Sequence, residues 1–198
     1  MELIRSVKEM ISDEADVVLL GDGEFDGVDL QSVVKHWNWD YVLRTSETNT
    51  LCWEDHWFPY KDTVAHLKPG EVFVIPEALF THRGYGPVTG LTWWRNGCEE
   101  PLHIVTNMEC ANEACHFYAK RFLIETCFSD NKGRGFNPSK SRLSDPQRIN
   151  RLLMAVFLAY YWIVALGVSA INDGWQGVIH RKHRCDLSLF QLGLGLLK

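Results

Sequence analysis

The sequence has little net charge, no regular cysteine framework and no apolar leader at its start. A net charge of −5 over 198 residues argues against a protein that coats nucleic acid through bulk positive charge, although a local basic strip can still bind DNA. Six cysteines without regular spacing indicate a reducing compartment, and the spacing of Cys110, Cys115 and His116 suits no common zinc site. Charged residues occur throughout the opening segment, so we expect no signal peptide and a cytoplasmic protein.

The sequence does contain enough apolar material for a folded core. Hydrophobic residues make up 46% of the chain and charged residues 23%, which is typical of a globular protein rather than a disordered one. A length of 198 residues suits one domain, or one domain with an insertion.

The first part of the chain alternates between helical and extended patterns. Apolar residues recur at helical spacing in residues 2–13, and an apolar run in residues 16–22 predicts a buried strand that ends in a glycine-rich turn. Asp29 is placed to cap a helix over residues 30–37, and residues 41–45 predict a second strand. This order of strand, helix and strand predicts a parallel pair with a right-handed crossover.

The pattern changes in the middle of the chain and becomes helical again towards its end. Proline, glycine and aromatic residues are frequent over residues 49–108, where short apolar runs predict a β-rich segment. A helix is expected over residues 112–132. A longer helix is expected over residues 146–170, with Pro146 in its first turn and Asp145 or Ser144 as its cap.

Four polar residues on the first of these helices form the most informative pattern. Tyr118, Arg121, Glu125 and Lys132 fall within roughly a 60° arc when placed at about 100° per residue. A carboxylate that can hold a metal is thus flanked by a phenol, a guanidinium and an ammonium group that can bind phosphate. Arg134 extends the basic strip past the end of the helix. This combination predicts phosphoryl-transfer chemistry on DNA.

A second carboxylate comes from the first predicted strand. That strand ends at Asp22, at the edge where open α/β sheets place their ligands. Two carboxylates from distant segments, here Asp22 and Glu125, are the usual way to hold Mg²⁺ or Mn²⁺. Simpler roles stay open, because aspartate next to glycine is a common turn residue and Arg121 is placed to form an ion pair with Glu125 on a solvated helix face.

The spacing Tyr-x2-Arg-x3-Glu-x6-Lys resembles the Y-R-E-K signature of DDE transposases of the insertion-sequence-four group. The segments GRGF after Lys132, LLGDGEFDG around Asp22 and RKHRCDLSLFQLGL near the end of the chain are also similar to that family. The resemblance runs from about Ile4 to Leu197 and implies an α/β ribonuclease-H-like core with a β-rich insertion. Under it, residues 1–48 belong to the core, 49–108 form the insertion, and 109–198 form the C-terminal helices and tail.

The resemblance also implies a function and a set of roles. The complete enzyme would cut and join DNA ends with two divalent ions, Mg²⁺ or Mn²⁺, held in part by Asp22 and Glu125. Tyr118, Arg121 and Lys132 would contact the phosphates of the terminal strand. The partners would be transposon ends and target DNA, together with self-association or an upstream transposase fragment, and no membrane.

The same resemblance implies a third carboxylate, on the first strand of the ribonuclease-H-like sheet. No aspartate before Asp22 is at the right end of a strand, and Asp26 and Asp29 lie in and after the turn that follows it. We therefore expect the chain to be the C-terminal part of the catalytic domain, without the first three strands. Such a fragment would not cleave DNA by itself.

Two alternatives remain at this stage. The chain is consistent with a non-catalytic remnant that binds DNA or a full-length transposase. It is also consistent with a single-span membrane protein, because residues 152–171 form an uncharged run long enough to cross a bilayer. Aromatic residues in the middle of this run favour a core helix instead, since membrane aromatics prefer the ends. The core-helix interpretation predicts that Phe157, Leu158 and Trp162 are mostly buried.

Overall fold

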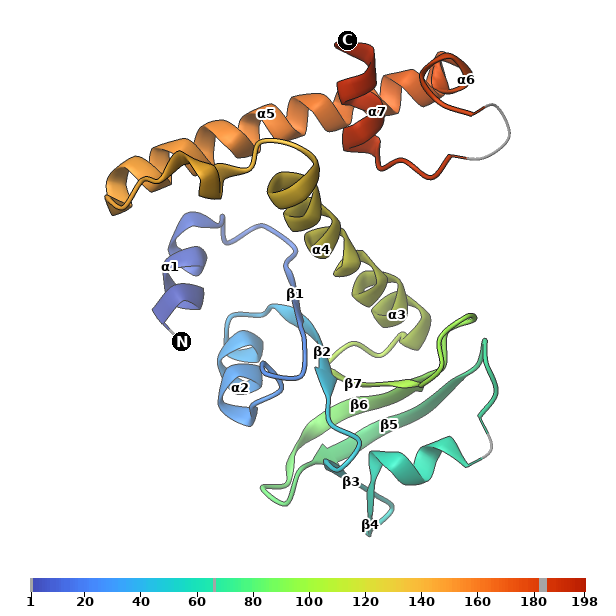
Figure 1. Cartoon of the computed structure of the whole chain (residues 1–198). Coiled ribbons are helices and arrows are strands. Elements are labelled where there is room, and N and C mark those ends of the chain that lie inside the picture. The colour runs from blue at the N-terminus through green and yellow to red at the C-terminus, as the bar shows by residue number, and fades with distance from the viewer. Residues whose placement is uncertain (1, 66, 182–184) are drawn as a thin grey trace. The chain divides into compact units, whose positions relative to one another are not determined.

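The structure is a computed structural model that describes residues 2–65, 67–181 and 185–198. For Arg134 it describes the backbone and not the side chain. It is a mixed α/β protein whose described strands form one seven-stranded sheet in the order β1-β2-β7-β6-β5-β3-β4 (Figure 1). The chain divides into two compact units, Met1–Arg121 and Phe122–Lys198. The sheet lies entirely in the first unit, and the second unit is helical.

The first unit contains all the strands and three of the helices. The helices are α1 (Glu2–Met10), α2 (Val28–His36) and α3 (Ala111–Lys120), with a 3-10 turn at Tyr60–Val64. The strands are β1 (Val18–Gly21), β2 (Asp40–Thr45), β3 (Thr50–Trp53), β4 (His56–Pro59), β5 (Val72–Phe80), β6 (Tyr85–Trp93) and β7 (Leu102–Thr106).

The predicted strand–helix–strand unit at the start of the chain is confirmed. Strands β1 and β2 pair in parallel, with Leu19 opposite Tyr41, and α2 connects them. The predicted cap of α2 is wrong, because the helix begins earlier and Gly27 occupies the N-cap position. Asp29 instead lies in the first turn of α2, where its carboxylate forms an ion pair with Arg83 at 2.9 Å.

The segment 49–108 is rich in strands, as predicted, and its strands extend the same sheet. Strand β7 pairs antiparallel with the free edge of β2, with Leu43 opposite Val105. Strand β6 then pairs with β7 and β5 with β6, both antiparallel. Polar backbone groups along the second edge of β2 are thereby satisfied by β7, so the segment is part of the sheet and not a separate layer.

Side chains of alternate strand residues fill the core of the first unit. The main cluster includes Tyr41 and Leu43 of β2, Val105 of β7 and Val34 of α2, all fully buried. Successive side chains of a strand point to opposite faces, so Arg44 lies on the face opposite to Leu43. Helix α3 packs against β1, β2 and β6.

The helix predicted over residues 112–132 is found as three consecutive pieces. Helix α3 ends at Lys120, α4 (Phe122–Ser129) follows, and a π-helical turn covers Asp130–Arg134. Arg121, between α3 and α4, has right-handed helical dihedral angles. The boundary between the two units falls directly after Arg121, so the four-residue pattern of the sequence is divided between them.

The second unit is built around one long helix. After α4 and the π-helical turn come a 3-10 turn (Pro138–Ser141), α5 (Pro146–Asn172), α6 (Gln176–Ile179) and α7 (Leu189–Leu196). The predicted start of α5 is confirmed: Pro146 is its first residue, and the Asp145 carboxylate accepts a hydrogen bond from the Arg148 amide at 2.8 Å.

Helices α5 and α7 approach each other closely through glycine. A Cβ atom on Gly167 of α5 would collide with the Leu189 backbone, and one on Gly193 of α7 would collide with the carbonyl of Ile163. Tyr160 and Phe190 stack beside this contact, with ring centroids 5.1 Å apart. The absence of side chains at the two glycines therefore lets the helix backbones touch.

The prediction that α5 is a core helix with buried Phe157, Leu158 and Trp162 is wrong. These side chains are 46%, 67% and 71% exposed. The buried residues of α5 are Val156, Ile163, Gly167 and Ala170, and of these Ile163 and Gly167 contact α7. Among the described helices, α5 alone is long and apolar enough to cross a membrane.

Candidate functional site

Asp22 lies where the sequence placed it, directly after β1 at the carboxyl edge of the parallel pair. The Phe25 amide donates a hydrogen bond to the Asp22 carbonyl at 3.0 Å, and the Glu24 amide lies 3.4 Å from the Asp22 carboxylate. Asp22 is therefore a turn residue at a sheet edge, and its half-buried carboxylate faces the region where α3 packs.

Tyr118 connects this edge to α3. Its side chain is fully buried, and burial raises the pKa of its hydroxyl, with a smaller contribution from the Asp22 carboxylate. The guanidinium groups of Arg121 and Arg44, and a hydrogen bond with Arg121, act in the opposite direction on that pKa. The Arg121 guanidinium lies 5.6 Å from the centre of the Tyr118 ring. We call Asp22, Arg44, Tyr118 and Arg121 the Tyr118 cluster.

The cluster brings together two predicted phosphate-binding residues and one predicted metal ligand. Tyr118 is buried, so its hydroxyl faces neighbouring side chains and not solvent. Arg44 is exposed at the end of β2, an otherwise buried strand. Sequence reasoning missed Arg44, although a single cation in a buried strand, close to its carboxyl end, is a signal that could have identified it.

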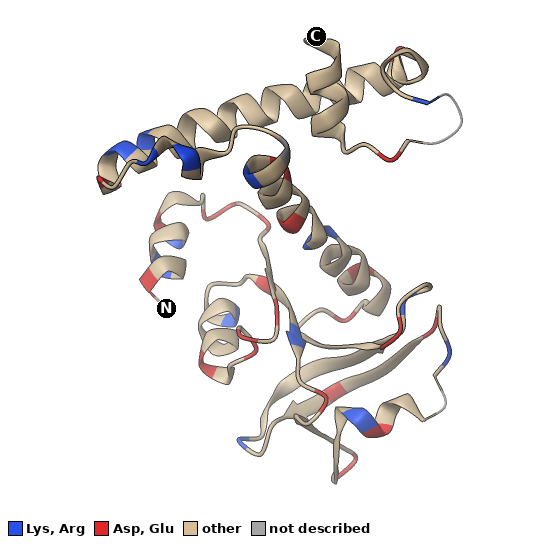
Figure 2. Ribbon diagram, in the orientation of Figure 1, with Lys and Arg blue, Asp and Glu red and all other residues tan. Residues whose placement is uncertain are grey.

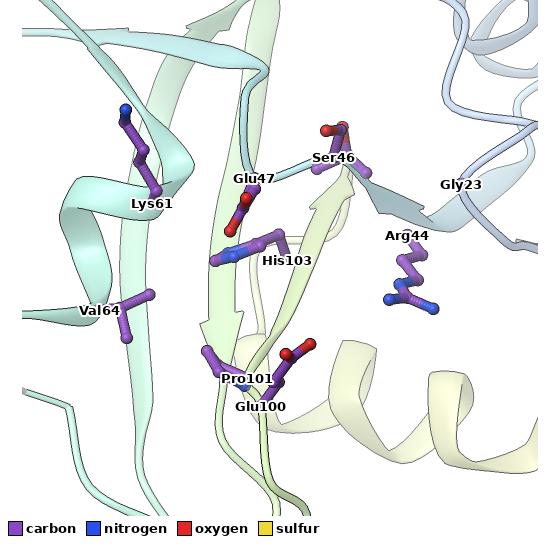
Figure 3. A pocket seen from close by; sticks show the side chains of 10 residues that line it. Gly23, Arg44, Ser46, Glu47, Lys61, Val64, Glu100, Pro101 and His103 are labelled. Carbon is purple, nitrogen blue, oxygen red and sulfur yellow. The ribbon is translucent and has the colours of Figure 1, made fainter.

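A pocket of about 560 Å³ adjoins Arg44 in the first unit (Figure 3). Its polar walls combine cationic and anionic groups: Arg44, Lys61, Glu47 and Glu100, with His103 among them. The remaining lining comes from Gly23, Thr45, Ser46, Val64 and Pro101. Because Gly23 follows Asp22 directly, the pocket opens beside the Tyr118 cluster.

His103 is the one histidine that this pocket places in its wall. Its Nδ1 atom is 3.2 Å from the Thr92 hydroxyl, which in turn is 2.5 Å from the Thr63 hydroxyl. Burial lowers the pKa of His103; the Glu47 carboxylate raises this pKa and the Arg44 guanidinium lowers it, both by smaller amounts. The imidazole is therefore neutral at neutral pH and is held in place by the two threonines.

Asp26 is close to Asp22 in sequence but has a different environment. Its carboxylate accepts hydrogen bonds from the Thr45 hydroxyl at 2.7 Å and the Asn49 side-chain amide at 2.8 Å. These contacts join the turn after β1 to the end of β2. The Asp26 carboxylate therefore stabilises the turn after β1 through these two hydrogen bonds.

The other predicted site residues belong to the second unit. Glu125 is exposed on α4, and Lys132 is exposed in the π-helical turn that follows. Arg134 ends that turn, and its side chain lies outside the described part of the chain. The structure thus groups Asp22 with Tyr118 and Arg121, whereas Glu125 and Lys132 form part of a separate compact unit.

The chemistry of the carboxylates suits a hard divalent cation. Asp22 and Glu125 offer oxygen ligands of the kind that Mg²⁺ and Mn²⁺ prefer. Within the described residues, three or more histidine, cysteine, aspartate or glutamate side chains do not come together in a group that could hold a metal. A scan of the sequence against protein-family models and a search of curated proteins both find no match for this chain.

Proposed function

We propose that this chain is part of the ribonuclease-H-like catalytic domain of a DDE transposase, which in its complete form cuts and joins DNA ends. The Tyr118 cluster is the observation that carries the proposal. It combines a carboxylate at the end of a parallel strand with two arginines and a tyrosine, and three of its four members belong to the residues that the family resemblance marks.

Arg44 and Arg121 supply the phosphate-binding part of the site. A guanidinium group can donate two parallel hydrogen bonds to one phosphate, and Arg stays charged at every physiological pH. Tyr118 is a positioning residue in this proposal, because its buried ring lies 5.6 Å from the Arg121 guanidinium. Lys132 adds a cation from the second unit.

Asp22 and Glu125 would hold the divalent ion. When bound, the ion would polarise the phosphodiester and lower the pKa of an attacking water or hydroxyl group. The chain's own residues bind the strand, orient the phosphate and keep the two arginines beside the carboxylate. Mn²⁺ bound to the chain is detectable by its electron paramagnetic resonance signal, which we expect Asp22→Ala to reduce without any need for catalysis.

A third carboxylate would have to come from a segment outside this chain. Asp26 is the nearest aspartate in sequence, but its carboxylate is committed to Thr45 and Asn49. We therefore expect no Mg²⁺-dependent or Mn²⁺-dependent cleavage by the 198 residues alone. A polypeptide carrying strands and an aspartate that complete the sheet should restore cleavage, and Asp22→Ala or Glu125→Ala should abolish it again.

DNA binding by the purified chain tests the proposal without cleavage. Fluorescence anisotropy with a labelled duplex should show binding that Arg44→Ala and Arg121→Ala each weaken by about 10-fold, the loss of one charge-assisted contact. Lys68→Ala is the matched control, because it removes an exposed cation outside the cluster and the pocket. Equal effects of all three substitutions would contradict a specific role for the cluster.

The non-catalytic alternative predicts the same DNA binding, but it gives the Asp22 and Glu125 carboxylates no role in holding a metal ion. In a remnant that only binds DNA, Asp22→Ala would leave Mn²⁺ binding unchanged, and a completing polypeptide would not restore cleavage. The two experiments on Asp22 therefore distinguish an incomplete enzyme from a binding protein.

A further inference from the structure

The exposed side of α5 carries a regular row of uncharged residues. Met154, Leu158, Tyr161, Ala165 and Val168 are all exposed, and their spacing is four, three, four and three residues. Three of them are more than half exposed: Met154 at 56%, Leu158 at 67% and Tyr161 at 73%. We call this row the α5 seam.

This spacing is the one that pairs helices. Hydrophobic residues that repeat every 3.5 positions on average keep one edge of a helix facing a partner helix along its length. The opposite side of α5 is already occupied, because Ile163 and Gly167 pack on α7. The seam is thus a second helix-packing surface, and it has no partner among the described residues of the second unit.

The charges on α5 favour a partner that runs antiparallel. No charged residue occurs between Leu152 and Asn172, and Figure 2 shows the basic residues of α5 near its beginning. Arg148 and Arg151 lie at that end, and Asp173 caps the other end. An antiparallel copy of the same helix would bring the arginines of one chain near Asp173 of the other, whereas a parallel copy would place like charges together.

We propose that the α5 seam is a homodimer interface, in which the α5 helices of two copies of this chain pack antiparallel. The uncharged seam is complementary to itself, so one surface can serve both copies, as a two-fold axis requires. Antiparallel packing also aligns the helix dipoles favourably. The proposal concerns the second unit alone and does not depend on DNA binding by the Tyr118 cluster.

Oligomeric state is the first test. We expect light scattering and sedimentation velocity on the full chain to show a dimer at micromolar concentration. Leu158→Glu should weaken dimerisation by at least about 100-fold, because it places a charge at the centre of the seam. Val178→Glu is the matched control: Val178 is 77% exposed on α6 in the same unit, and this variant should remain a dimer. Circular dichroism checks that both variants keep their helices.

A charge exchange tests the orientation. Asp173→Lys should weaken the dimer by about 25-fold, because the two-fold axis repeats the contact and each of the two lost ion pairs contributes about 5-fold. Because a cation at a helix C-terminus stabilises that helix, this variant separates dimerisation from helix stability. Combining it with Arg148→Glu and Arg151→Glu should restore wild-type affinity. Failure of this rescue would overturn the antiparallel arrangement.

Two outcomes would overturn the interface itself. One is a monomer at every concentration up to about 50 µM, far above the dissociation constant of a standard-size interface. The other is a chain that floats with vesicles of neutral and anionic phospholipid and loses this flotation in Leu158→Glu, which would assign the seam to a bilayer. A dimer that stays in the aqueous fraction, and that Leu158→Glu alone dissociates, supports the proposal.

Discussion

The two units of this chain distribute their apolar side chains in opposite ways. In the first unit, large side chains such as Tyr41, Tyr60 and Leu91 are fully buried. In the second unit, Leu158 and Trp162 are more than two-thirds exposed, and the tightest contact is made by glycines. The difference indicates that the first unit is organised around its own core, whereas the second leaves large apolar side chains on its surface.

The largest effect should come from a cavity in the first unit. Leu91→Ala removes a fully buried side chain from β6 and should lower the free energy of unfolding by about 3 kcal/mol. Val178→Ala, at a 77% exposed position in the second unit, should change it by less than about 0.5 kcal/mol. Urea denaturation measures the free energy of unfolding of both variants. Equal losses would contradict the difference in side-chain burial between the two units.

A second substitution tests the close contact in the second unit. Gly193→Ala adds a Cβ atom that collides with the Ile163 carbonyl, and should cost about 2 kcal/mol. Gly133→Ala is the control, because a Cβ atom there meets no other atom within 4 Å. Hydrogen exchange should show faster exchange in α5 and α7 and unchanged exchange in β2 and β7. Faster exchange throughout the sheet would contradict separate compact units.

Asp26 and Asp22 lie close together in the turn after β1, and we expect Asp26 to contribute more to stability than Asp22 does. Asp26→Ala leaves the Thr45 hydroxyl and the Asn49 amide without their acceptor and should cost about 2 kcal/mol of stability. Asp22→Ala should cost less than about 0.5 kcal/mol, since Asp22 is half-buried and makes one long contact to a backbone amide. Thermal unfolding ranks the two variants, and the reverse order would argue that Asp22 is only a turn residue.

The smallest effect is a pH dependence in the first unit. Because burial lowers the pKa of His103 below its ordinary value of 6.5, the unfolded chain binds a proton at higher pH than the folded chain does. The stability that His103 contributes is complete above pH 6.5 and falls as the pH decreases below that value. The stability difference between wild type and His103→Asn should therefore shrink from pH 7.5 to pH 5 in urea titrations. A constant difference would contradict a buried neutral imidazole.

The order of local elements could be predicted from sequence because it follows from short-range patterns. Short apolar runs identified β1 and β2, and Pro146 with the two residues before it identified the start of α5. A single cation in a buried strand was a usable signal for Arg44, but its role depends on which face of β2 meets α3, and short-range patterns do not show that. The start of α2 was misplaced because Gly27 and Asp29 are both acceptable near a helix N-terminus.

The exposure of α5 was the main error, and its cause is physical. A segment without charged residues gives no signal of which side faces a neighbour, so Phe157 and Leu158 were expected in the core. The small residues, Gly167 and Ala170, instead mark the packed side, because they allow the closest approach of another helix. Hydrophobicity alone therefore could not identify the packed side, which carries Gly167 and Ala170 together with Val156 and Ile163.

The dependence of DNA affinity on salt is the most direct test of the central claim, that the Tyr118 cluster binds DNA phosphate. Each phosphate that a cation neutralises contributes about 0.9 to the slope of log affinity against log salt concentration for duplex DNA. Arg44→Ala and Arg121→Ala should each reduce that slope by about 1, and Lys68→Ala should leave it unchanged. Wild-type slopes in both arginine variants, with a reduced slope for Lys68→Ala, would contradict the proposed site.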